Sequence, residues 1–154
     1  EALQPLKARV LAALEGAASA CGCRMTHRWG EHTYADVRDS QPIVAAYVDN
    51  AARLGRVVRE PAVSGHRVVG STDMGNVSYL TPSIHPMIQV APAGVPIHTR
   101  EFAEHAKGPG GDPAVVDGAK AMAMPIVDLW VDADLRAAAA AELARISGAG
   151  EVLR

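Results

Sequence analysis

The middle of this chain, from about residue 66 to residue 98, is divided into short apolar runs by glycine, proline and serine. The runs are "RVV", "VSYL" and "MIQVA", and longer segments with helical periodicity lie on both sides of them. Short apolar runs bounded by turn residues are typical of buried strands. We therefore expect an α/β fold in which a mixed sheet packs against helices.

Four segments have apolar residues at three- and four-residue steps, which is the spacing of an amphipathic helix. They cover residues 3–20, 42–54, 113–130 and 134–146. Gly22 and Gly55 follow the first two segments as stop signals, and Asp112 precedes the third as a candidate N-cap. Pro125 should kink the third helix, because proline removes a backbone hydrogen bond. Its large apolar residues should face inward: Val115, Val116, Met122, Ile126 and Trp130.

Residues 23–29, "CRMTHRW", alternate between two faces and predict a half-buried strand. This strand and the first helix look separable from the rest of the chain. We place the boundary within residues 30–40, which divides the chain into residues 1–33 and residues 34–154.

Composition excludes several classes of protein. A length of 154 residues suits one domain with a sizeable core. The net charge of −2 and the 4% aromatic content argue against nucleic-acid binding. No apolar run is long enough to span a membrane, and no secretory signal opens the chain. Cys21 and Cys23 are expected to be reduced thiols, and we expect a cytoplasmic location.

The six histidines form no local metal-binding motif such as H-E-x-x-H. His27 is best explained as a packing residue, and His85 could lie buried near the glycine-containing stretch 70–78. His98 follows a Gly-Val-Pro turn that could fix its ring, as a zinc ligand requires. One histidine does not make a zinc site, since zinc takes at least three protein ligands.

The stretch "GSTDMGNVS", residues 70–78, holds small and short polar residues between two apolar runs. It is either a plain connection between strands or the edge of an active site. Glycines in such a loop let backbone N–H groups approach an anionic ligand closely.

Three segments in order, "GSTDMGNVSYLTPSIHPMIQV", "GVPIHTREF" and "DGAKAMAMPIVDL", resemble the C-terminal part of the zinc-dependent aminoacylase/carboxypeptidase family. The aminobenzoyl-glutamate hydrolase-like amidohydrolases and their dipeptidase relatives are the most similar branch. The resemblance implies a partial catalytic domain over residues 34–154, preceded over residues 1–33 by the end of an α+β lid domain.

The resemblance also implies the chemistry. In this family two metal ions, usually zinc, activate a water that attacks an amide carbonyl, and a glutamate acts as general base. His98 matches the last metal ligand of the family. Thr72, Asp73 and Asn76 match the segment that lines the substrate cleft. An N-acyl amino acid, an aminobenzoyl-glutamate and a dipeptide are all compatible substrates.

The other ligands and the base of the family have no counterpart in this sequence. We therefore expect the chain to be the C-terminal portion of a hydrolase, inactive and without bound zinc when alone. Its uncovered apolar surface should cause self-association, so a homo-oligomer is expected. Two alternatives stay open: a non-catalytic module that binds an acidic small ligand, and an assembly subunit that pairs with a separate chain.

Overall fold

The computed structural model describes residues 3–59 and 70–147, and the chain divides into two compact units. The first unit is Glu1–Thr33 and the second is Tyr34–Arg154. The assignment of these units to a lid domain and a catalytic domain stays a prediction.

In the first unit, α1 (Leu3–Ala20) confirms the predicted helix, and none of its described residues is buried. The helix ends at Gly22, whose φ of +64° lets the Cys23 N–H donate to the Ala18 carbonyl at 2.8 Å. Beyond this turn, the Lys7 ammonium lies 4.3 Å from the centre of the Trp29 ring. The segment after the turn is thus held against α1 by a side-chain contact.

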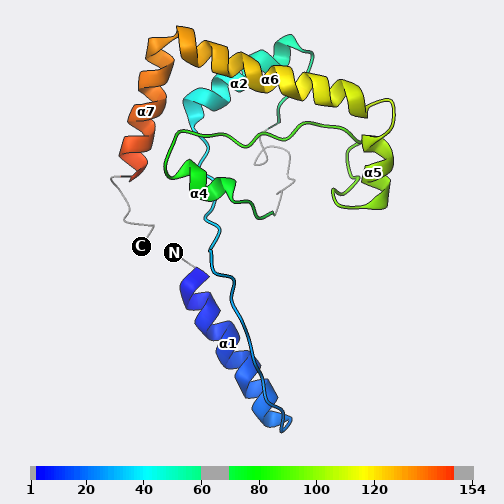
Figure 1. Ribbon diagram of the computed structural model, residues 1–154, viewed down its shortest axis with the longest axis vertical. Coiled ribbons are helices and arrows are strands. Elements are labelled where there is room, and N and C mark those ends of the chain that lie inside the picture. Colours follow the sequence, from blue (N-terminus) through cyan, green and yellow to red (C-terminus); the bar gives the residue numbers. More distant parts are fainter. Residues whose placement is uncertain (1–2, 60–69, 148–154) are drawn as a thin grey trace. The chain divides into compact units, whose positions relative to one another are not determined.

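The second unit is built of helices. They are α2 (Gln41–Arg53), α4 (Met74–Ser78), α5 (Arg100–Ala106), α6 (Gly111–Val131) and α7 (Ala133–Ser147). Figure 1 shows α6 lying across α2, with α7 leading away from the C-terminal end of α6. The helices predicted over 42–54, 113–130 and 134–146 are confirmed, with ends shifted by one to two residues.

The expected α/β fold is wrong. The described residues contain no strand, and their β-type pairing is a single parallel bridge between Asp39 and Ser83. The run "VSYL" lies in α4 and the turn after it, while residues 23–29 and 87–91 have no regular structure. The run "RVV" before residue 70 lies outside the described residues. A short apolar run does not by itself specify a strand, because a strand needs a neighbouring backbone to pair with.

The core of the second unit lies between α2 and α6. Tyr47 and Ala51 of α2 pack against Ala121 of α6, and Leu54 and Ile84 flank them. The face of α6 that packs inward carries small residues: Gly111, Ala114, Ala121 and Pro125. The expectation that the large residues of this helix face inward is therefore wrong. Small side chains occupy this face because they let α2 and α6 approach each other closely.

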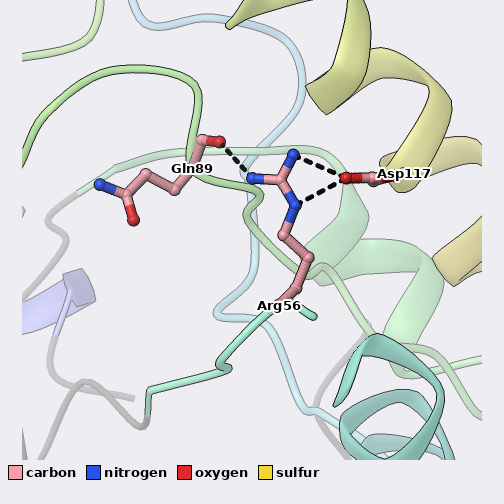
Figure 2. Close-up of polar contacts among 3 residues, drawn as sticks. All are labelled: Arg56, Gln89 and Asp117. Atoms are coloured by element: carbon pink, nitrogen blue, oxygen red, sulfur yellow. Dashed lines mark hydrogen bonds and ion pairs between the residues drawn. The ribbon is translucent and has the colours of Figure 1, made fainter. Parts of the chain in front are cut away.

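Arg56, just beyond α2, joins three segments of the second unit (Figure 2). Its Nε and Nη2 atoms lie 2.9 and 2.8 Å from Asp117 Oδ2 on α6. Its Nη1 atom donates to the Gln89 carbonyl at 3.1 Å. This guanidinium links the end of α2, the irregular segment around residue 89 and α6.

Both long helices at the end of the chain are capped by side chains from nearby segments. Asp132 accepts hydrogen bonds from the backbone N–H groups of Asp134 and Leu135, which caps the N-terminus of α7. Arg136 donates to the carbonyls of Leu129 and Trp130 at the end of α6. Because these caps lie between α6 and α7, they fix the corner between the two helices.

Candidate functional site

The stretch 70–78 consists of an irregular segment, a turn at Asp73 and the short helix α4. Thr72 Oγ1 accepts from the Met74 N–H at 3.3 Å, which closes a local turn at the start of the helix. Asp73 occupies the N-cap position, but its side chain makes no capping hydrogen bond and the residue is exposed. Of the three predicted substrate-contacting residues, Asp73 thus has the most accessible polar group.

The segment 35–38 runs along α4 and is bonded to it. Asn76 Oδ1 accepts from the Ala35 N–H at 3.1 Å, and Ser78 Oγ accepts from the Arg38 N–H at 3.0 Å. Ser78 Oγ also donates to the Gly75 carbonyl at 2.6 Å. Asn76, predicted to contact substrate, therefore has a structural role in this chain.

A charged and aromatic cluster lies beside α4. The Tyr79 hydroxyl donates to Asp36 Oδ1 at 2.9 Å, and the Arg38 guanidinium carbon lies 3.8 Å from the centre of the Tyr79 ring. Burial, followed by the hydrogen bond to Asp36, raises the pKa of Tyr79, and the Arg38 charge opposes this shift. Sequence reasoning missed this cluster, because Tyr79 lies 43 residues from Asp36 and no local pattern connects them.

His98 is the one non-glycine residue with positive φ in the described part of the chain, at +63°. Such a conformation is uncommon for residues with a side chain, and it concentrates at functional sites. Thr99 follows it and caps α5, accepting from the Phe102 N–H at 3.1 Å. The exposed imidazole of His98 is therefore presented by a tight turn fixed on its C-terminal side.

His85, which the sequence suggested could be buried, is exposed in the structure. Its backbone N–H donates to Asp39 Oδ1 at 3.3 Å. Cys21 and Cys23 are exposed free thiols.

The described residues do not form a complete metal site. Among residues 3–59 and 70–147, no group of three or more His, Cys, Asp or Glu side chains is placed to hold an ion. His98 offers a single imidazole, which is fewer than the three protein ligands that zinc takes. Zinc binding within this described part of the chain does not fit the residues present.

A small cavity lies where α7 meets the segment 38–40 and α4. Its volume is about 10 Å³, and Ser40, Ser78 and Glu142 are among its lining residues. Ser40 Oγ is buried and has no hydrogen-bond partner. A space of this size holds one water molecule and is too small for a dipeptide.

No family model matches the chain. The chain is similar to curated proteins over most of its own length. It is 31% identical over 127 residues to the Xaa-Arg dipeptidase of Homo sapiens, and this alignment covers 82% of the chain. It is 32% identical over 128 residues to the Xaa-Arg dipeptidase of Mus musculus.

The chain resembles peptidases. It spans 29% of the length of each of these two relatives. The similarity supports the peptidase part of the resemblance seen in the sequence, and it agrees with the dipeptidase relatives named there. None of the helices among the described residues is long and apolar enough to cross a membrane.

Proposed function

We propose that this chain is a C-terminal portion of a metal-dependent hydrolase, an amidohydrolase or peptidase that cleaves the amide bond of a dipeptide or an N-acyl amino acid. The observation that carries the proposal is the similarity to two Xaa-Arg dipeptidases over 82% of the chain. Because the chain spans 29% of each relative, we assign the activity to a longer polypeptide. A dipeptide is the favoured substrate, and a cytoplasmic location is part of the proposal.

In this proposal His98 supplies one imidazole ligand to zinc. The support is the exposure of the imidazole and the positive φ of His98, a backbone conformation that concentrates at functional sites. When bound, zinc would activate water and polarise the amide carbonyl. The remaining ligands and the general base are assigned to polypeptide outside this chain.

Asp73 is the favoured substrate contact. Thr72 and Asn76 already bind backbone N–H groups, whereas the Asp73 carboxylate is exposed and does not cap its helix. If the substrate carries a C-terminal arginine, as the relatives' name indicates for them, a carboxylate complements its guanidinium. Asp73→Asn should then raise KM for Xaa-Arg dipeptides and leave KM for uncharged dipeptides unchanged.

The test of the proposal compares this chain with the polypeptide encoded by the complete reading frame that contains it. The complete polypeptide should hydrolyse dipeptides and lose activity in a chelator, with recovery on adding zinc. The chain alone should show no hydrolysis.

Two histidine variants of the complete polypeptide sharpen this test. His98→Ala should lower kcat/KM by about 100-fold or more, because a ligand is lost. His85→Ala is the matched control, since it also removes an exposed imidazole, and it should leave activity unchanged. If the His98→Ala polypeptide is as active as the His85→Ala polypeptide, His98 is not a metal ligand. Absence of any amide hydrolysis would favour the binding or assembly alternatives.

A further inference from the structure

Helix α6 has an exposed face of large apolar residues opposite the small-residue face that packs on α2. The exposed fractions are 71% for Val115, 58% for Met122, 48% for Ile126 and 75% for Trp130. At about 100° per residue these four residues form one row along roughly 22 Å of helix. An apolar row of this length on an otherwise packed helix marks an interaction surface.

A second row widens this surface. Val116, Val127 and Val131 are 50%, 51% and 78% exposed, and they lie about 100° around the helix from the first row. The two rows together span about 180° of the helix surface. A helix that is apolar on both its faces is typical of the interior of a larger protein. We call these seven residues the large-residue face.

Two charged residues lie among the apolar residues of this face. Lys120 lies in the second row between Val116 and Val127, and Asp112 lies in the first turn of α6 in line with Trp130 of the first row. The two other carboxylates of the helix are directed elsewhere: Asp117 pairs with Arg56, and Asp128 Oδ2 accepts from the Asn50 side chain. The occupant of the large-residue face is therefore a mainly apolar surface, with polar or charged groups only where it meets Asp112 and Lys120.

The width of the face selects among possible occupants. A single helix contacts a stripe about 100° wide, so one helix covers little more than half of the face. Pairing of α6 with α6 of a second copy, or with the apolar stripe of α1, would leave the other row in water. An occupant at least two secondary-structure elements wide, such as a sheet or a helix pair, covers both rows.

The chain spans only 29% of the length of its two relatives, so a longer polypeptide of this kind would have room for such an occupant outside this chain. We infer that the large-residue face of α6 packs against the remainder of a longer polypeptide, through a mainly apolar surface at least two elements wide. The inference rests on the proposed function in one respect, namely that the chain is a portion of a longer protein.

Trp130 reports directly on this contact. Trp29→Phe leaves Trp130 as the only tryptophan of these 154 residues, and in the complete polypeptide any tryptophan outside them is also replaced by phenylalanine. Acrylamide quenching of its fluorescence is then measured in the chain alone, over a dilution series followed by sedimentation, and in the complete polypeptide from the same reading frame. We expect ready quenching in the monomeric chain and at least about five-fold weaker quenching in the monomeric complete polypeptide, because packed apolar contacts exclude the quencher.

Three results would overturn the inference. If Trp130 is protected from acrylamide only when the chain dimerises, the large-residue face contacts a second copy of the chain. If Trp130 is already protected in the monomeric chain, another part of the same chain covers the large-residue face. Ready quenching in the complete polypeptide, or a reading frame that ends with this chain, removes the proposed occupant.

A pair of variants gives an independent check. Ile126→Asn should lower the Tm of the complete polypeptide and leave the Tm of the chain alone nearly unchanged. Lys120→Asn, which replaces one polar side chain by another within the second row of the same face, should change neither. Dipeptide hydrolysis is measured separately. A protected Trp130 in an inactive polypeptide would reject the proposed function but keep the docking. A readily quenched Trp130 in an active polypeptide would reject the docking alone.

Discussion

Gly75 of α4 and Ala35 approach each other so closely that a Cβ at position 75 would lie 1.8 Å from the Ala35 carbonyl oxygen. The same crossing is held by the Asn76 side chain, which accepts from the Ala35 N–H. Gly75 is therefore required in "GSTDMGNVS", because the backbone at Ala35 crosses α4 at this position and leaves no room for a Cβ.

Gly75→Ala should destabilise the second unit by about 3 kcal/mol or more, because both groups in the clash belong to backbone and neither can rotate away. Gly70→Ala is the matched control, since a Cβ there meets no atom within 4 Å. The control should be neutral or slightly stabilising. Urea unfolding followed by circular dichroism measures both, and equal midpoints would show that the crossing is absent.

The ion pair between Arg56 and Asp117 should contribute about 1 kcal/mol of coupling in a double-mutant cycle with Arg56→Met and Asp117→Asn. Their side chains are 28% and 25% exposed, so water screens the pair only in part. The pair of Lys107 and Glu104 is the control, with side chains 70% and 67% exposed. Its coupling should be several-fold smaller and should vanish sooner with added salt. Equal coupling energies for the two pairs would contradict the partly buried position of Arg56.

Asn50 should be sensitive to truncation. It is 2% exposed, and its amide donates to Asp128 Oδ2 at 2.5 Å across the interface of α2 and α6. Asn50→Ala should lower the free energy of unfolding by about 2 kcal/mol, because the carboxylate loses its donor. Asp49→Ala, at the exposed neighbouring position, should change it by less than about 0.5 kcal/mol. Thermal unfolding of both variants at one pH checks this, and equal effects would argue against the buried amide.

Tyr47 should make stability depend on alkaline pH. Burial raises its pKa above the usual value, and the nearby Arg56 charge opposes the shift. The unfolded chain then loses this proton at lower pH than the folded chain. Stability is retained below pH 10 and falls by up to about 1.4 kcal/mol per pH unit as pH rises above 10.

Tyr47→Phe removes the titrating group, so its unfolding free energy should fall less steeply above pH 10 than that of the parent chain. Tyr79→Phe serves as a comparison, because the pKa of Tyr79 is also raised, in part by Asp36. Parallel curves for the parent and Tyr47→Phe would contradict a raised pKa at Tyr47.

His98 should respond to substitution according to its backbone. Its φ of +63° suits glycine, so His98→Gly should keep or raise the Tm of the chain. His98→Ala keeps the Cβ and its strain, so it should be about 1 kcal/mol less stable than His98→Gly. In the complete polypeptide both variants should lose activity if His98 is a ligand. Equal stability of the Gly and Ala variants would show that the turn is not strained.

The long helices α1, α2 and α7 were determined by the sequence itself. Their signals are local: apolar residues at helical steps in 3–20, 42–54 and 134–146, and glycine at the stop positions Gly22 and Gly55. Positive φ at both glycines shows why these residues end the helices. Local rules are enough here because a helix satisfies its own backbone hydrogen bonds.

Only the tertiary structure decided which helix faces are buried and how the apolar runs between the helices pack. A strand needs a partner backbone, so the runs at 77–80 and 87–91 did not become a sheet, and side chains such as Asn76 and Ser78 bond the backbone of the segment 35–38 instead. Periodicity identified the large apolar residues of α6 as its inward face and did not identify the small-residue face. Close packing on α2 selected the small-residue face and left Trp130 and its neighbours exposed.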